Sequence, residues 1–155
     1  MELKDLKKGY DSLAGKYKLP SFEELNEGFE IEKIERESDA LLRTIRKVMM
    51  EKVVNSLGFI EMLLNPMNAP RMYHAYIKSI GTEDKKIIEK IYGVLAEISV
   101  ESLEREIEYD EKEEAELIKK TFKIWNEMKP EFAQLVSKIK KPDSSSLKKE
   151  RSYFG

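Results

Sequence analysis

The fold is decided by one stretch of the sequence, residues 29–64, which reads FEIEKIERESDALLRTIRKVMMEKVVNSLGFIEMLL. Its apolar residues recur every three or four positions, the spacing that places side chains on one face of an α-helix. This stripe consists of Leu42, Ile45, Met49, Val53, Leu57, Ile60 and Leu64. The spacing predicts one long helix from about Phe29 to Leu64, ended by Asn65-Pro66, at the centre of the core.

Helical spacing continues on both sides of this stretch. A helix is predicted over residues 3–17, and another over residues 68–80, with Met72 and Tyr73 on its buried face. No strand is predicted, because alternation of apolar and polar residues is confined to residues 29–31 and no Asn-Gly or Asp-Gly hairpin dipeptide occurs.

The C-terminal half carries two further long stripes, from Ile87 to Ile107 and from Ala115 to Ile139. Pro130 lies within the second stripe and is predicted to kink that helix rather than end it. Residues 82–128 are compatible with one helix or two. We favour a break at Tyr109-Asp110, because Asp110 followed by Glu113 has the spacing of a helix N-terminus.

These patterns predict an all-α fold, a helical bundle of about five to six helices with two or three long helices and a short basic C-terminal tail. The chain has 155 residues, which is the size of one domain. We assign residues 1–141 to a single helical domain. Residues 142–155, which begin with Pro and Ser, are expected to be a basic tail.

The composition indicates the cellular compartment in which the chain is expected. The chain is 41% hydrophobic and 37% charged, and it contains no Cys. Disulfides and thiolate metal sites are therefore excluded, which favours a reducing, cytoplasmic location. No apolar run approaches the ~18 residues that a membrane span requires, so no membrane association is expected.

Few catalytic chemistries fit these residues. The single histidine, His74, is expected to be solvated or hydrogen-bonded rather than a catalytic base. Glycine-rich phosphate loops, zinc-protease motifs and nucleophile elbows do not occur in the sequence. We expect no cofactor and predict that the chain is not an enzyme. An enzyme based on carboxylates is the alternative.

Acidic residues are concentrated in residues 101–116, where nine acids stand against Arg105 and Lys112. Glu104 and Glu108 are four residues apart, so one helix face could present both to a divalent metal. The Glu-x-x-His pairs of helical di-metal proteins are missing, however. A solvated acidic face is the favoured interpretation, and metal binding is left open.

Basic residues suggest a nucleic-acid partner. In the tail, the candidate partner-binding or nucleic-acid-binding residues are Lys148, Lys149, Arg151, Tyr153 and Phe154, which combine phosphate-binding charges with rings that can stack on bases. Two internal basic clusters are Arg43-Arg46-Lys47 and Lys119-Lys120-Lys123. Against this hypothesis, the net charge is −2 and the pI is about 5.7.

The favoured function is a non-enzymatic helical interaction or assembly module. Its long helices carry more apolar surface than a monomer needs, so a protein partner or self-association is expected. Met50 and Met62 lie off the central stripe and could mark a partner face. A nucleic-acid accessory protein is the second hypothesis, and a carboxylate-based enzyme is the third.

Overall fold

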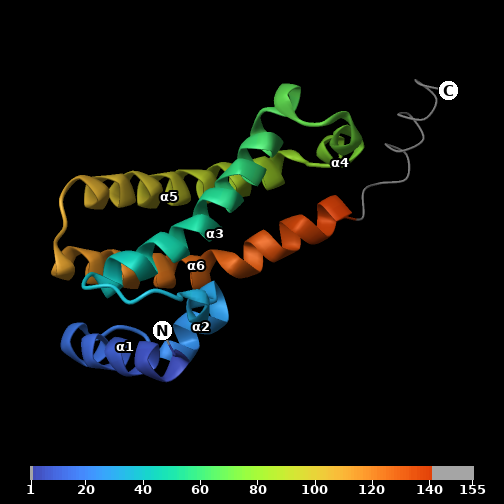
Figure 1. Ribbon diagram of the computed structural model, residues 1–155. Helices are drawn as coiled ribbons and strands as arrows, with labels where there is room; N and C mark the ends of the chain where they lie inside the picture. The colour runs from blue at the N-terminus through green and yellow to red at the C-terminus, as the bar shows by residue number, and fades with distance from the viewer. Residues whose placement is uncertain (1, 141–155) are drawn as a thin grey trace.

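The computed structural model describes residues 2–140, most of which lie in α-helices (Figure 1). The α-helices are α1 (Leu3–Tyr17), α2 (Phe22–Phe29), α3 (Leu41–Leu64), α4 (His74–Lys78), α5 (Thr82–Ile107) and α6 (Glu111–Lys140). Three short 3-10 helices lie in the connections, η1 (Ile31–Lys33), η2 (Pro66–Asn68) and η3 (Arg71–Tyr73). No strand occurs in this part of the chain, and the predicted all-α bundle is confirmed.

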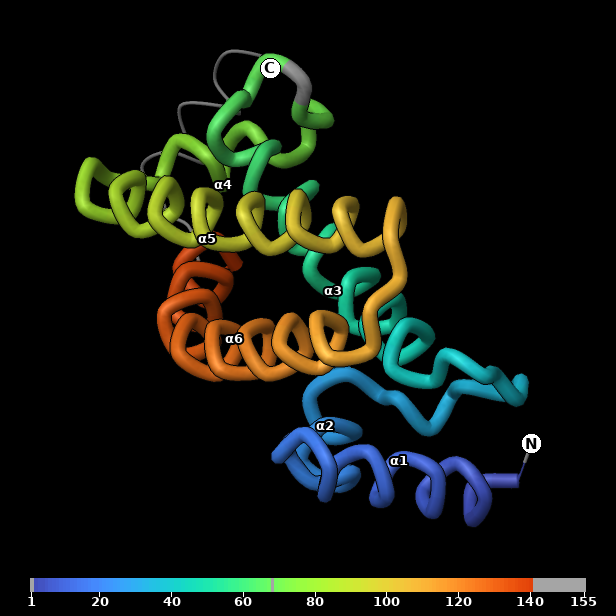
Figure 2. The backbone as a smooth tube through the Cα atoms, turned by 90° about the vertical axis from the view of Figure 1, so that its left-hand side faces the viewer, coloured from blue at the N-terminus to red at the C-terminus, as the bar shows by residue number. Residues whose placement is uncertain are grey.

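Helices α3, α5 and α6 pack against one another pairwise and form the centre of the molecule. Figure 2 shows α5 above α6, with α3 along one side of both. In both views α1 and α2 lie on the side of α6 that is away from α5. Helix α2 contacts α3, and α4 contacts α6.

The buried core is built on the predicted stripe of α3. Leu42, Ile45, Met49, Val53 and Ile60 are fully buried, and Leu57 and Leu64 pack against them partly buried. The N-terminal helices join the same core, because Phe29 of α2 meets Trp125 of α6 with ring centroids 5.8 Å apart. The apolar spacing read from the sequence is therefore the spacing that the core uses.

The predicted helix over Phe29–Leu64 is wrong in its first third. Phe29 ends α2, and Glu30 adopts a left-handed conformation with φ of 54°. Side chains then take the backbone bonds that a helix would use: Asn26 Oδ1 accepts from the Glu32 N–H at 2.9 Å, and Ser38 Oγ accepts from the Ala40 N–H at 3.0 Å. Such local bonds compete with helix formation, so α3 begins only at Leu41.

The segment after α3 is also less helical than predicted. Residues 66–73 form η2 and η3, and only His74–Lys78 form α4. Met72 and Tyr73, which were predicted to be buried, are 73% and 37% exposed. Pro70 prevents a helix from starting at Asn68, because the residue before a proline avoids the helical region, and Ala69 is extended with ψ of 142°.

The predicted break between the last two long helices is confirmed. Helix α5 ends at Ile107 and α6 begins at Glu111. Asp110 Oδ1 accepts from the Glu113 N–H at 3.0 Å, which satisfies one of the free donors at the start of α6. Pro130 lies inside α6, which continues to Lys140 and changes direction along its length (Figures 1 and 2).

Truncation of Leu95 tests the position of the core. Leu95 of α5 is fully buried, so Leu95→Ala is expected to lower the free energy of unfolding by about 2–5 kcal/mol. The matched control is Leu3→Ala at the start of α1, where the side chain is 44% exposed and a change within about 0.5 kcal/mol is expected. Urea denaturation followed by circular dichroism measures both, and equal losses would contradict this core.

Candidate interaction surface

Arg46 of α3 is the centre of an ion-pair network that joins the three long helices. Its guanidinium donates to Glu114 of α6, from Nε to Oε2 at 2.5 Å and from Nη2 to Oε1 at 3.3 Å. From α5, Ser102 Oγ accepts from Nη1 at 2.6 Å, and Glu106 Oε1 accepts from Nη2 at 2.8 Å. One side chain therefore contacts both neighbouring helices.

The pair formed by Arg46 and Glu114 is buried. Arg46 is 1% exposed and Glu114 is 0% exposed. Burial alone would lower the pKa of Arg46, but the hydrogen bonds to Glu114 and Glu106 raise that pKa above its ordinary value. The guanidinium therefore stays charged, and it stabilises the fold only while its acidic partners remain in place.

Most residues of the two internal basic clusters form ion pairs with acidic side chains. Arg43 donates to Glu106 Oε2 at 3.1 Å, and Lys47 Nζ lies 3.6 Å from the same oxygen. In the second cluster, Lys119 pairs with Glu116 at 2.8 Å, and Lys120 pairs with Glu101 at 2.5 Å. These positive charges are balanced locally, which weakens their attraction for a phosphate backbone.

Part of the acidic run at 101–116 is engaged in the same way, through Glu101, Glu106 and Glu114 among others. Beyond the pairs above, Glu111 accepts from the hydroxyl of Tyr17 at 2.6 Å, and this bond lowers the pKa of Glu111. Among residues 2–140, no three His, Asp or Glu side chains lie together in a way that could hold a metal ion. Six of the nine acids in the run are exposed, Glu101 and Glu111 are half-buried, and Glu114 is buried. Most of the run is therefore solvated, as the favoured interpretation held, and Glu114 is the exception.

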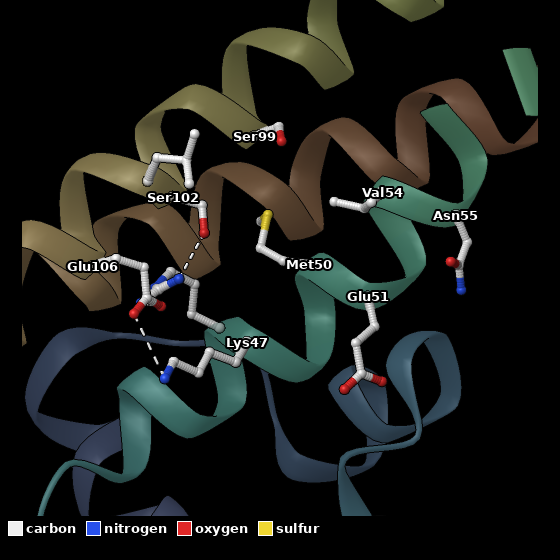
Figure 3. Close-up of a pocket in the computed structure, with 10 residues that line it drawn as sticks. Lys47, Met50, Glu51, Val54, Asn55, Ser99, Ser102 and Glu106 are labelled. Atoms are coloured by element: carbon white, nitrogen blue, oxygen red, sulfur yellow. Dashed lines mark hydrogen bonds and ion pairs between the residues drawn. The ribbon is translucent and has the colours of Figure 1, made fainter. Parts of the chain in front are cut away.

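An open groove of about 590 Å³ lies between α3 and α5, directly beside this network. Figure 3 shows Met50 and Val54 of α3 facing Ser99 of α5, with α6 behind them. The groove is lined by Arg46, Lys47, Met50, Glu51, Val54, Asn55, Ser99, Ser102, Leu103 and Glu106. The lining contains two positive side chains, Arg46 and Lys47, and two negative ones, Glu51 and Glu106. The groove therefore carries no net charge.

Apolar side chains continue along α5 beyond the groove. Val100, Leu103 and Ile107 are 57%, 62% and 88% exposed, and Val54 on α3 is 51% exposed. The side chain of Met50 forms part of the groove wall and is 7% exposed. We call these five residues the α3–α5 face. Of the two off-stripe methionines named from the sequence, Met50 lines this groove and Met62 does not.

The candidate residues of the C-terminal tail lie outside the residues that the structure describes. These residues are Lys148, Lys149, Arg151, Tyr153 and Phe154. Their proposed role in nucleic-acid or partner binding stays a prediction, as does the domain boundary at 141.

His74 was expected to be solvated or hydrogen-bonded, and the structure describes one of its ring nitrogens as neither. Its side chain is half-buried at the start of α4, and its Nε2 atom is buried without a hydrogen-bond partner among the described residues. The groove between α3 and α5 does not include His74. Within that groove, the ionisable groups Arg46, Lys47, Glu51 and Glu106 all take part in ion pairs.

Comparisons with known proteins give no match: no family model, curated protein or solved structure is similar to this chain. Within the described part of the chain, none of the helices combines the length and apolar character needed to cross a bilayer. Function is therefore argued from the geometry of the surface itself.

Removal of one member of the buried ion pair tests the network. Arg46→Met or Glu114→Leu alone leaves a buried charge without its partner, so each is expected to cost about 3–5 kcal/mol of unfolding free energy. The double variant Arg46→Met/Glu114→Leu is expected to cost less than the sum of the two single losses. Chemical denaturation of all four proteins measures this coupling.

A matched control for this cycle is Lys119→Met, which removes the cation of a more exposed pair with Glu116. Here we expect a loss of about 1 kcal/mol or less. Additive losses in the Arg46 and Glu114 cycle, or a loss at Lys119 as large as at Arg46, would contradict the network.

Acid sensitivity is predicted for Glu106. The hydrogen bond from Arg46 lowers the pKa of Glu106 from 4.5 to about 2. Because the folded-state pKa is the lower one, ionised Glu106 contributes its full stability above pH 4.5 and loses it as the pH falls toward 2. The advantage of wild type over Glu106→Gln should therefore shrink across that window.

This advantage is expected to be about 1 kcal/mol or less at neutral pH, because solvent screens a partly exposed carboxylate. Urea unfolding of both proteins at stepped pH values measures it. A difference that stays constant from neutral pH into the acid range would show that Glu106 does not titrate in this manner.

Proposed function

We propose that this chain is a non-enzymatic assembly module that self-associates through the α3–α5 face. The observation that carries the proposal is the row of apolar side chains on α5, Val100, Leu103 and Ile107, each more than half exposed. The absence of Cys supports a cytoplasmic setting for this module.

Helix α5 has two apolar sides, and only one of them is buried against residues that the structure describes. Ile88, Ile91, Leu95 and Ile98 face the core and are buried. Residues 100, 103 and 107 are spaced by three and four, so they share a second side of the helix. Removing such a group of apolar side chains from water is favourable, and a docked partner would cover them.

The charge of the groove beside this face favours a second copy of the chain as the partner. In a two-fold symmetric contact the same surface meets itself, so a surface with net charge would repel its copy. The groove between α3 and α5 has equal numbers of positive and negative side chains. By contrast, the groove between α5 and α6 carries four glutamates against Arg105 and Lys120, and two copies of it would repel each other.

The non-enzymatic part of the proposal is supported by the state of the ionisable groups. Arg46 holds its proton tightly, since its bonds to Glu114 and Glu106 raise its pKa, and proton transfer requires a group that titrates near neutral pH. The groove contains no hydroxyl beside a histidine, because the one histidine of the chain lies elsewhere. Its ion pairs instead hold α3 and α5 in place.

The substitution Leu103→Glu tests the interface. It places one new negative charge from each copy at the centre of the face, and we expect the dissociation constant of the dimer to rise by at least about 30-fold. Sedimentation velocity over a micromolar concentration series measures the change. The matched control is Leu3→Glu, which introduces the same charge at an exposed leucine of α1 and should leave the dissociation constant unchanged.

A wild-type chain that stays monomeric throughout this series would overturn the proposal. An equal effect of both substitutions would assign the association to another surface. Salt-sensitive binding of labelled oligonucleotides by the monomer would instead favour the nucleic-acid hypothesis.

A further inference from the structure

A second apolar groove lies at the opposite end of the long helices from the Arg46 network. It measures about 430 Å³ and is formed by the later part of α3, by η3 and α4, and by the end of α6. Its lining residues are Phe59, Met72, Tyr73, Tyr76, Val136, Ile139 and Lys140. Met72 is 73% exposed and Val136 is 38% exposed, so apolar side chains at this groove face solvent.

The position of this groove relative to the chain suggests what covers it. Lys140 is the last residue that the structure describes, and it is also part of the groove lining. The C-terminal segment is therefore joined to a residue that lines the groove. We propose that the chain's own C-terminal segment, residues 142–155, folds back so that Tyr153 and Phe154 occupy this groove.

The chemistry of the groove suits two aromatic side chains. Phe59 is held edge-to-face against Phe132 with ring centroids 6.2 Å apart, and Tyr73 and Tyr76 supply further rings. Aromatic side chains bury roughly 150–250 Å² each and favour offset or edge contacts with other rings. Met72 adds a flexible thioether, which adapts to the shape of an aromatic neighbour.

The length of the segment permits this return. From Lys140 to Tyr153 an extended chain spans at most about 45 Å, far more than the distance across a groove that starts at Lys140. The sequence Pro142-Asp143-Ser144-Ser145-Ser146 consists of residues that favour turns. A short tether also gives the segment a millimolar effective concentration, so weak contacts suffice to fill the groove.

Other occupants lack this advantage. A free partner would have to compete with a segment that is always present at millimolar effective concentration. The basic residues Lys148, Lys149 and Arg151 are not needed in the apolar groove, so they are left for the rim and the solvent. This inference is independent of the α3–α5 face, since the two grooves share no lining residue.

A spin label near the end of the full-length chain tests the proposal. The chain has no Cys, so Ser152→Cys provides a unique attachment site for a nitroxide. In ¹H–¹⁵N spectra we expect loss of amide intensity at Met72, Tyr73 and Val136, with Val54 and Leu103 unaffected. Replacing Tyr153 and Phe154 by serine in the labelled chain should restore the lost intensity.

Two controls make this result specific. Met72→Ser is expected to restore intensity at the groove, whereas Met67→Ser, at a residue that is 93% exposed and does not line the groove, should not. In a mixture of spin-labelled unenriched chain with unlabelled ¹⁵N chain, no intensity should be lost.

Three results would overturn the proposal. The first is an absence of intensity loss at the groove. The second is a loss that persists after Tyr153 and Phe154 are replaced, because mere tethering near Lys140 would then explain it. The third is a loss in the mixture, which would assign the groove to the tail of a second copy.

Discussion

The buried ion pair between Arg46 and Glu114 is the constraint on which the arrangement of the long helices depends. Apolar side chains allow neighbouring helices to shift with little change in their contacts, but a buried guanidinium is stable only where its acceptors meet it. Arg46 finds these acceptors on α6 and on α5, where Ser102 and Glu106 complete its bonds. The bonds of Arg46 therefore fix the register of α3 against α5 and α6. Burying the charges costs desolvation free energy, which apolar residues in the same place would avoid.

This network also determines the character of the surface beside it. Glu106 binds Arg43, Arg46 and Lys47, so charges that would otherwise project from α3 and α5 are paired with one another. Beside these paired charges, the apolar side chains of Leu103 and Ile107 are exposed. A groove without net charge, next to exposed apolar side chains, loses less solvation when it leaves water, which is why we propose assembly there rather than catalysis.

Apolar spacing and helix capping were predicted from the sequence, whereas local side-chain hydrogen bonds, such as that of Ser38, and contacts with a partner helix were missed. The α3 stripe and the break at Asp110 depend on spacing and capping within a few residues, and both were predicted. Arg46 was instead counted as a surface cation, although it stands four residues after Leu42 and three before Met49, on the buried side of α3. Leu103 and Ile107 were placed on the same stripe as the buried residues of α5, because spacing alone does not show where the buried side of a helix ends.

The central claim is that Arg46 is buried and bonded between three helices, and the exchange of its side-chain Nε proton with water tests this most directly. In ¹H–¹⁵N spectra at neutral pH, assigned by the loss of the signal in Arg46→Lys, we predict a persistent, shifted Nε–H resonance that exchanges far more slowly than that of exposed Arg36. An Arg46 signal that exchanges as fast as that of Arg36 would place the guanidinium in solvent and contradict the account.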